Sequence, residues 1–271
     1  MKIGFVGLGS LGSGMARRIA RSGYRLTACD ISPDARAAFD EPGAALEADA
    51  VATARQVDAL CVCVRMDADL ESLAGDGRLF AALGDGGLFL IHSTVAPELC
   101  QKLAAVARGH GVEVLDTGVS GGAAAALDGH LSIYVGGDPK AFERARPLLE
   151  TLGKSVIHLG PVGCGMRGKL LNNLVSIANY GMAAAILDLG ERLNFAREPL
   201  RQALMAGSAD SYAMHVIPGL LRPEGAAALQ ELLGKDLAHA RTLAPPADPA
   251  MAALAAAAEA MLARLARTAP R

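Results

Sequence analysis

The sequence has few aromatic residues and no excess of either charge. Its 271 residues include six Phe, four Tyr and no Trp. Base-stacking platforms and aromatic cages depend on such rings, so neither is expected. Lys and Arg (26) nearly balance Asp and Glu (28), and the net charge of −2 gives no general attraction to nucleic acid or to an anionic membrane. We therefore expect a ligand to be held by backbone amides and small polar groups.

The sequence also lacks the cysteine patterns of a zinc site or a disulfide framework. Its five cysteines are an odd number, and none lies in a Cys-x-x-Cys pair. The simplest interpretation is buried, reduced thiols and no metal site. The apolar N-terminal stretch soon breaks into glycines and offers no convincing cleavage site, so it is not expected to be a secretory signal. These features favour a cytoplasmic protein.

Apolar runs alternate with helical patterns over the first 160 residues. Runs that are continuously apolar and alternate with helices are typical of a parallel sheet covered on both faces. We therefore expect an α/β domain at residues 1–160. The predicted strands cover residues 3–6, 24–30, 59–64, 87–91, 112–115, 131–135 and 155–158.

The pattern changes after residue 160, where strand signals end. Residues 165–194 contain no proline, so we expect one long helix there. Its uncharged stretch, residues 170–187, includes Asn172 and Asn173 among other polar residues, which favours a buried helix over a membrane span. Three further helices are expected, at residues 199–206, 226–243 and 249–267, with a loop around Pro245 and Pro246. Residues 161–271 are thus predicted to form an all-α domain, joined to the first domain by the long helix.

A glycine-rich loop follows the first predicted strand and opens the first helix. It reads Gly7-Leu8-Gly9-Ser10-Leu11-Gly12. The first glycine permits a tight turn, the second lets a pyrophosphate approach the backbone, and the third lets the helix pack closely. Asp30 ends the second strand, where a carboxylate can accept both ribose hydroxyls and would repel a 2′-phosphate. The sequence therefore predicts a Rossmann-type dinucleotide-binding domain that prefers NAD to NADP.

Polar residues follow two later strands. Ligands of open α/β sheets bind at the carboxyl ends of the strands, so Thr94 is placed to touch a bound cofactor. Residues 116–122 form a second predicted loop, in which the Ser120 hydroxyl and the amides of Gly121 and Gly122 suit a carboxylate.

Two lysines are candidates for chemistry. Lys169 and Asn173 lie one helical turn apart, so they share a face of the long helix. Burial favours the neutral form of an amine, so a lysine on a buried helix can exchange a proton with an alcohol. Lys235 and Asp236 are equally consistent with an exposed ion pair and with a functional role.

Together these motifs resemble the β-hydroxyacid dehydrogenase family, which includes 3-hydroxyisobutyrate dehydrogenase and tartronate semialdehyde reductase. The resemblance covers nearly the whole chain through four ordered motifs. They are the glycine loop with Gly14-Met15-Ala16, residues 116–131, residues 163–173 and Lys235-Asp236-Leu237. This sequence departs from the family at several positions: Leu11 replaces a usual Met, Gly118 a usual Pro, His130 a common Thr, and Arg65-Met66 a frequent Leu-Pro.

The resemblance implies hydride transfer between NAD or NADP and a small 3-hydroxy acid, or reduction of a semialdehyde or glyoxylate-type substrate. Lys169 would be the general acid/base, with Ser120 and Asn173 completing the catalytic set. The substrate-binding residues would be Ser120, Gly121, Gly122, Lys169, Asn173 and Lys235. The cofactor-binding residues would be Gly7, Leu8, Gly9, Ser10, Leu11, Gly12, Asp30, Ile31, Val64, Arg65, Met66, Thr94 and Lys235.

Two other functions stay open on the sequence alone. An imine reductase would resemble the same family but usually lacks the lysine. A non-catalytic dinucleotide-binding module would lack it too and would carry basic segments, so Lys169 argues against both. The apolar composition and the long helix further predict a homodimer or homotetramer.

Overall fold

The structure, a computed structural model, describes residues 1–245 and 247–269. Pro246 of the predicted loop and the last two residues of the predicted helical domain lie outside the described part. The chain divides between Lys169 and Leu170, inside helix α9 (Cys164–Arg192), whereas the sequence placed the division after residue 160. The start of α9 belongs with the sheet because its backbone packs on it: a Cβ on Gly165 would lie within 2.5 Å of three backbone atoms of the sheet.

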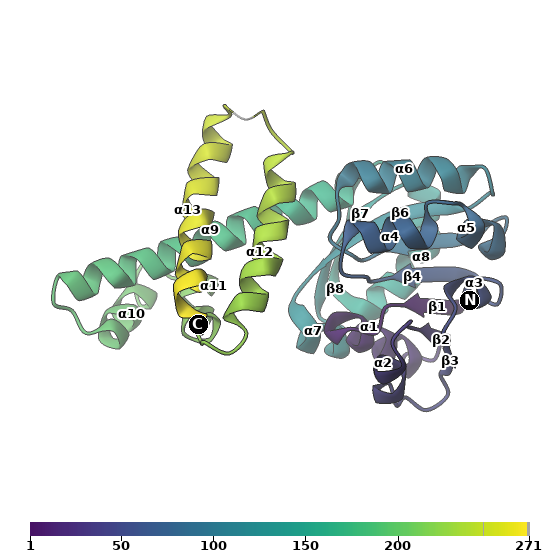
Figure 1. Ribbon diagram of the computed structural model, residues 1–271, viewed down its shortest axis with the longest axis horizontal. Coiled ribbons are helices and arrows are strands. Elements are labelled where there is room, and N and C mark those ends of the chain that lie inside the picture. The colour runs from purple at the N-terminus through teal and green to yellow at the C-terminus, as the bar shows by residue number, and fades with distance from the viewer. Residues whose placement is uncertain (246, 270–271) are drawn as a thin grey trace. The chain divides into compact units, whose positions relative to one another are not determined.

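An eight-stranded sheet forms the centre of the first unit (Figure 1), in the order β3-β2-β1-β4-β5-β6-β7-β8. Neighbouring strands from β3 to β6 are parallel. Strand β7 runs antiparallel to β6, which corrects the expectation of a fully parallel sheet. The connection from β6 to β7 is short, and a parallel crossover needs about a dozen residues or more. The strands are β1 (Lys2–Val6), β2 (Arg25–Cys29), β3 (Ala45–Glu47), β4 (Ala59–Val62), β5 (Leu88–Ile91), β6 (Glu113–Ser120), β7 (Leu131–Gly136) and β8 (Gly153–Gly160).

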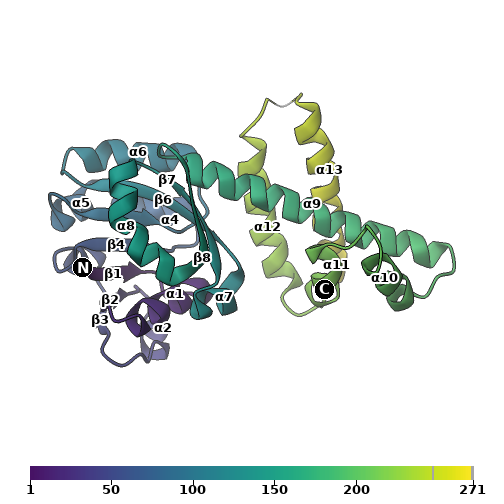
Figure 2. The ribbon, with the colours of Figure 1, turned by 180° about the vertical axis from the view of Figure 1, so that it is seen from behind.

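Helices cover both faces of this sheet, as expected (Figure 1 and Figure 2). Ile3 and Phe5 of β1 are buried on one face in a core that includes side chains of α1 and α8. The next strand residue, Val6, is buried on the other face with side chains of α3 to α6. The helices are α1 (Ser10–Arg21), α2 (Pro33–Ala38), α3 (Ala50–Ala54), α4 (Asp67–Ala74), α5 (Arg78–Leu83), α6 (Pro97–Arg108), α7 (Gly122–Asp128) and α8 (Pro139–Leu152).

The described residues of the second unit form helices joined by turns, with no strand among them. Leu174 and Ile177 of α9 share a core with side chains of α11, α12 and α13. Gly181 lets α9 and α13 approach closely, since a Cβ there would lie 1.8 Å from the Ala257 carbonyl oxygen. Both α9 and α13 are long and apolar enough to cross a membrane by length and composition alone, yet each buries one face in this core. The remaining helices are α10 (Arg197–Met205), α11 (Tyr212–Leu220), α12 (Ala226–Arg241) and α13 (Pro249–Thr268).

Candidate active site

The glycine-rich loop joins β1 to α1 at the carboxyl edge of the sheet. β1 lies between β2 and β4, where the strand order reverses, and open α/β sheets bind ligands at such a point. Gly7 has a φ of 97°, and a Cβ there would lie 2.2 Å from the Cys63 carbonyl oxygen. A Cβ on Gly12 would lie 2.0 Å from the Gly7 carbonyl oxygen. A Cβ on Gly9 would meet no described atom within 4 Å, so open space borders the loop there.

Asp30 lies directly after β2 and faces the same loop. Its Oδ2 accepts a hydrogen bond from the Leu8 amide at 2.7 Å, and its Oδ1 accepts one from the Ser32 amide at 2.8 Å. Each carboxylate oxygen keeps a further lone pair for a ribose hydroxyl. Ile31 is 89% exposed, and Met66 after β4 is 40% exposed. Exposed apolar side chains at this edge of the sheet suit contact with a flat ring and its sugar.

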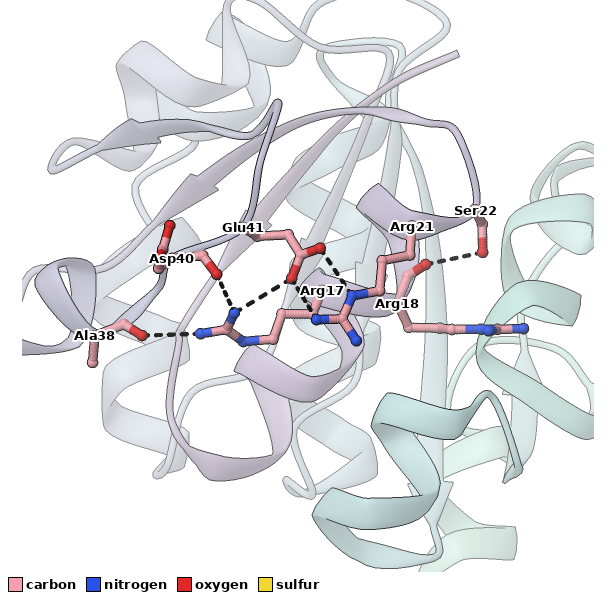
Figure 3. Close-up of polar contacts among 7 residues, drawn as sticks. All are labelled: Arg17, Arg18, Arg21, Ser22, Ala38, Asp40 and Glu41. Atoms are coloured by element: carbon pink, nitrogen blue, oxygen red, sulfur yellow. Dashed lines mark hydrogen bonds and ion pairs between the residues drawn. The ribbon is translucent and has the colours of Figure 1, made fainter.

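Two arginines of α1 hold the segment that follows α2 (Figure 3). Arg21 donates two hydrogen bonds of 2.9 Å to the Glu41 carboxylate. Arg17 donates to the Ala38 carbonyl oxygen at 2.9 Å, and its guanidinium lies 4.8 Å from the centre of the Phe39 ring. Both guanidinium groups are thus engaged within the protein.

A third arginine lies closer to the predicted ribose site. Arg36 of α2 donates from Nη1 to the Asp30 carbonyl oxygen at 2.5 Å. Arginine accommodates a 2′-phosphate in dinucleotide sites. Arg36 therefore places a positive group at the backbone of the residue whose carboxylate disfavours NADP. Arg36 was not singled out from the sequence.

The ends of β4 and β5 are tied together at this edge. The Val64 amide donates to the Ser93 hydroxyl oxygen at 2.7 Å, which joins the segment carrying Val64, Arg65 and Met66 to the segment carrying Thr94. Ser93 is 3% exposed and was not singled out from the sequence. Its signal was a hydroxyl residue two positions after a buried strand.

Strand β6 carries the second half of the predicted site. Alternate residues of a strand share a face, so Asp116, Gly118 and Ser120 lie on one side of β6. A Cβ on Gly118 would lie 2.7 Å from the Cβ of Lys169. Lys169 is only 8% exposed, as the sequence predicted for this position. The structure therefore brings Lys169 against the strand that ends at Ser120.

The sequence was wrong about the local structure of residues 116–122. It assigned them to a loop, whereas residues up to Ser120 continue β6 and pair with β7 as far as Ser132. Only Gly121 and Gly122 adopt the positive φ angles of a turn, 141° and 79°. The following helix, α7, lies beside α1 (Figure 1 and Figure 2), and a Cβ on Gly14 would lie 3.1 Å from the Ala123 carbonyl oxygen. The turn after Ser120 is thus packed against the helix that opens at the glycine loop.

Asp116 holds the start of α9. Its Oδ1 accepts from the Gly163 amide at 2.8 Å, and its Oδ2 accepts from the Met166 amide at 2.6 Å. Burial raises the pKa of Asp116 to about 6, against the lowering effect of these amide hydrogen bonds. Asp116 begins a segment that was noted in the sequence, residues 116–122, but no role was predicted for it.

His92 is a second buried polar residue that the sequence did not assign. It follows β5, is 1% exposed and stacks on Phe5 with ring centres 6.0 Å apart. Its Nδ1 lies 3.0 Å from the Thr117 hydroxyl oxygen, while its Nε2 has no hydrogen-bond partner within the described residues. Burial lowers the pKa of His92 to about 4, so the ring is neutral near pH 7.

The second unit contains the other two predicted site residues. The Asn173 side-chain amide donates to Asp236 Oδ2 at 2.7 Å, and its oxygen accepts from the side-chain amide of Asn172 at 3.2 Å. Asp236 is 4% exposed, which excludes the exposed ion pair as an account of Lys235 and Asp236. Asp236 therefore fixes the orientation of Asn173.

A cavity of about 750 Å³ lies elsewhere in the first unit, near the amino end of β6. Side chains of both charges line it, among them Arg108, Glu113 and Asp138, and none of the predicted site residues does. Apart from Lys169 on α9, the predicted site residues of this unit lie instead at or just beyond the carboxyl ends of the strands.

Comparison with known proteins agrees with this geometry. Residues 2–160 match the NAD binding domain of 6-phosphogluconate dehydrogenase. The NAD-dependent L-serine dehydrogenase of Pseudomonas aeruginosa is 32% identical over 254 residues, which cover 90% of this chain and 85% of that protein. The chain belongs to the β-hydroxyacid dehydrogenase family.

A second curated relative and a solved structure agree with this family. The 2-hydroxy-3-oxopropionate reductase of Escherichia coli is 34% identical over 216 residues, 80% of this chain and 74% of the reductase. The structure of Mycobacterium tuberculosis 3-hydroxyisobutyrate dehydrogenase with L-serine aligns with a TM-score of 0.84 and 26% identity, over 98% of this chain and 94% of that one. The predicted family and fold are thereby confirmed, and the roles of single residues stay predictions.

Proposed function

We propose that this protein is an NAD(P)-dependent dehydrogenase of a small 3-hydroxy acid, or a reductase of the corresponding semialdehyde, with NAD preferred. The observation that carries the proposal is the position of Lys169, a buried lysine packed against Gly118 on the strand that ends at Ser120. The relatives named as an L-serine dehydrogenase and a 2-hydroxy-3-oxopropionate reductase support this substrate class.

The residues at the carboxyl edge of the sheet fit a dinucleotide. The open space at Gly9 and the uncapped first turn of α1 suit a pyrophosphate. Asp30 would accept the ribose hydroxyls, while Ile31 and Met66 offer apolar contact to the base. When bound, the nicotinamide accepts or supplies the hydride.

The groups on and after β6 would handle the substrate. The Ser120 hydroxyl and the amides of Gly121 and Gly122 would bind its carboxylate. The neutral amine of Lys169 would take the hydroxyl proton as the alcohol is oxidised and return it in the reverse direction. Asn173, oriented by Asp236, would hold the substrate, and Lys235 would assist substrate and cofactor binding.

A spectrophotometric panel tests the proposal. L-Serine, 3-hydroxyisobutyrate, 3-hydroxypropionate and tartronate semialdehyde are each assayed with NAD(H) and NADP(H). We expect Lys169→Ala to lower kcat by about 10²- to 10⁴-fold and to retain NADH binding, which is read directly by NADH fluorescence because the chain has no Trp. The control is Lys154→Ala, at an exposed position of β8. NADH binding without turnover of any compound would favour the non-catalytic module, and turnover of cyclic imines alone would favour an imine reductase.

We further propose a homodimer or homotetramer that forms through an apolar stripe on α9. Leu171, Val175, Met182, Ile186 and Leu189 recur at helical spacing and are all more than a third exposed. Light scattering at micromolar concentration should give a multiple of the 27.8 kDa chain mass, and Met182→Glu should reduce it. A wild-type mass of one chain would contradict this proposal.

We also propose that the protein works in the cytoplasm. Burial raises the pKa of the Cys29, Cys61 and Cys100 thiols, which keeps them protonated and unreactive, as suits a reducing compartment. Fractionation of expressing cells tests this, and recovery from a secreted or membrane fraction would contradict it.

A further inference from the structure

Helix α9 is capped by a side chain from another element. The first amides of a helix have no partner within it, and helices α8 and α13 satisfy theirs with Asp138 and Asp248, the residues directly before them. In α9 the corresponding acceptor is Asp116, which reaches Gly163 and Met166 from strand β6 across 47 and 50 residues of sequence. The cap therefore fixes α9 to the sheet as well as satisfying the amides at the start of the helix.

The capped turn leads directly to Lys169. Lys169 follows Met166 by three residues, which is about one helical turn. Its Cβ faces Gly118, two residues along β6 from Asp116. The anchor and the lysine thus occupy successive positions along the same face of the same strand.

We propose that Asp116 is a positioning residue, which fixes the height of Lys169 along β6 and so its distance from the Ser120 hydroxyl. This inference rests on the proposed role of Lys169 as the general acid/base. It assigns a catalytic consequence to a residue that touches neither substrate nor cofactor.

The chemistry of the cap requires a carboxylate. A carboxylate accepts from both amides, whereas an asparagine accepts with one atom and turns an N–H toward the second amide. Asp116 is fully buried, so its charge is costly, and the two hydrogen bonds offset part of that cost. The ionisable groups that influence Asp116 from its neighbours are Arg167 on α9 and Cys100 on α6.

Asp116→Asn is the direct test, and Asp138→Ala is its control. Asp138 accepts from both amides with Oδ1 alone, so alanine is needed there to remove the cap, and only α9 carries a proposed catalytic residue. We expect Asp116→Asn to lower kcat by about 10- to 100-fold with an unchanged KM for NAD, and Asp138→Ala to leave both constants unchanged. Hydrogen exchange in the peptide spanning residues 163–169 should accelerate in Asp116→Asn alone.

The outcomes separate the inference from the proposed function. The positioning role would be overturned if Asp116→Asn kept the wild-type kcat. It would also be overturned if kcat and NAD affinity fell together, in proportion to the loss of Tm. Full turnover in Lys169→Ala would instead overturn the function on which it rests. If Asp116→Asn does not fold, Asp116→Ser, which keeps one acceptor in a smaller side chain, must show the same selective loss of kcat.

Discussion

Adding one methyl group to Gly118 is expected to displace Lys169. Gly118 lies in a strand and outside the left-handed region, so Gly118→Ala leaves the backbone conformation unstrained. The new Cβ would lie 2.7 Å from Lys169 Cβ and 3.0 Å from its Cγ. Carbon atoms in contact prefer about 3.5–4.0 Å, so α9 or β6 must shift by about 1 Å.

The size of the effect follows from that shift. Overpacking of this kind costs about 1–3 kcal/mol of folding free energy. A misplacement of about 1 Å at a reacting group lowers turnover by about 10²-fold. Cofactor affinity should be unchanged, because the glycine loop and Asp30 lie at the ends of β1 and β2.

The assay compares kcat for the best substrate, the Kd for NADH and the Tm of each variant. Gly219→Ala in α11 is the control, because its new Cβ would meet no described atom within 4 Å. That variant should gain up to about 1 kcal/mol of stability and keep wild-type kcat. If Gly118→Ala keeps wild-type kcat, either Lys169 does not contact β6 this closely or it does not transfer the proton.

Two further predictions concern cofactor choice and pH. Asp30→Ser should raise kcat/KM for NADP relative to NAD by about 10-fold, because it removes the repelling carboxylate and leaves Arg36 in place. The double variant Asp30→Ser with Arg36→Ala should lose that gain. An unchanged ratio in the single variant would assign the discrimination to other residues. Burial raises the pKa of Asp116 to about 6, so its contribution to stability is lost as pH rises from about 4 through 6. Burial lowers the pKa of His92 to about 4, so its contribution is lost as pH falls from about 6.5 toward 4. The free energy of urea unfolding should therefore be compared with that of the wild type across this pH range. Relative to the wild type, Asp116→Asn should lose stability as the pH falls and His92→Gln should gain it, each by on the order of 3 kcal/mol at most. Variant curves that run parallel to the wild-type curve would refute both assignments.

The cofactor edge could be predicted from sequence because its signals are local. The steric need for glycine at positions 7 and 12 arises within one turn of chain, and the structure shows backbone atoms where each side chain would be. The long helix was predicted at residues 165–194 and runs over Cys164–Arg192, since nothing in its sequence favours an earlier end. In both places local propensity and tertiary structure agree.

The second half of β6 could not be predicted in the same way. Asp, Thr, Gly and Ser are common in turns, and only the pairing with β7 makes residues up to Ser120 a strand. Helix α11 was missed because Pro218 and Gly219 lie inside it. The hydrogen bonds from α9 to Asp116 join residues far apart in sequence, so no local pattern could reveal them.

One face of strand β6 carries the aspartate that anchors α9, the glycine that contacts Lys169 and the serine hydroxyl proposed to bind the substrate. Asp116, Gly118 and Ser120 occupy successive positions on one face, about 6.7 Å apart, and a slip of one residue would turn all three away together. The groups of this unit that are assigned to the cofactor lie at the ends of β1, β2, β4 and β5 instead. Substitutions in the glycine loop should therefore raise the KM for the cofactor, and substitutions on this face of β6 should lower kcat. A loop variant that lowers kcat alone would show that the two halves are not independent.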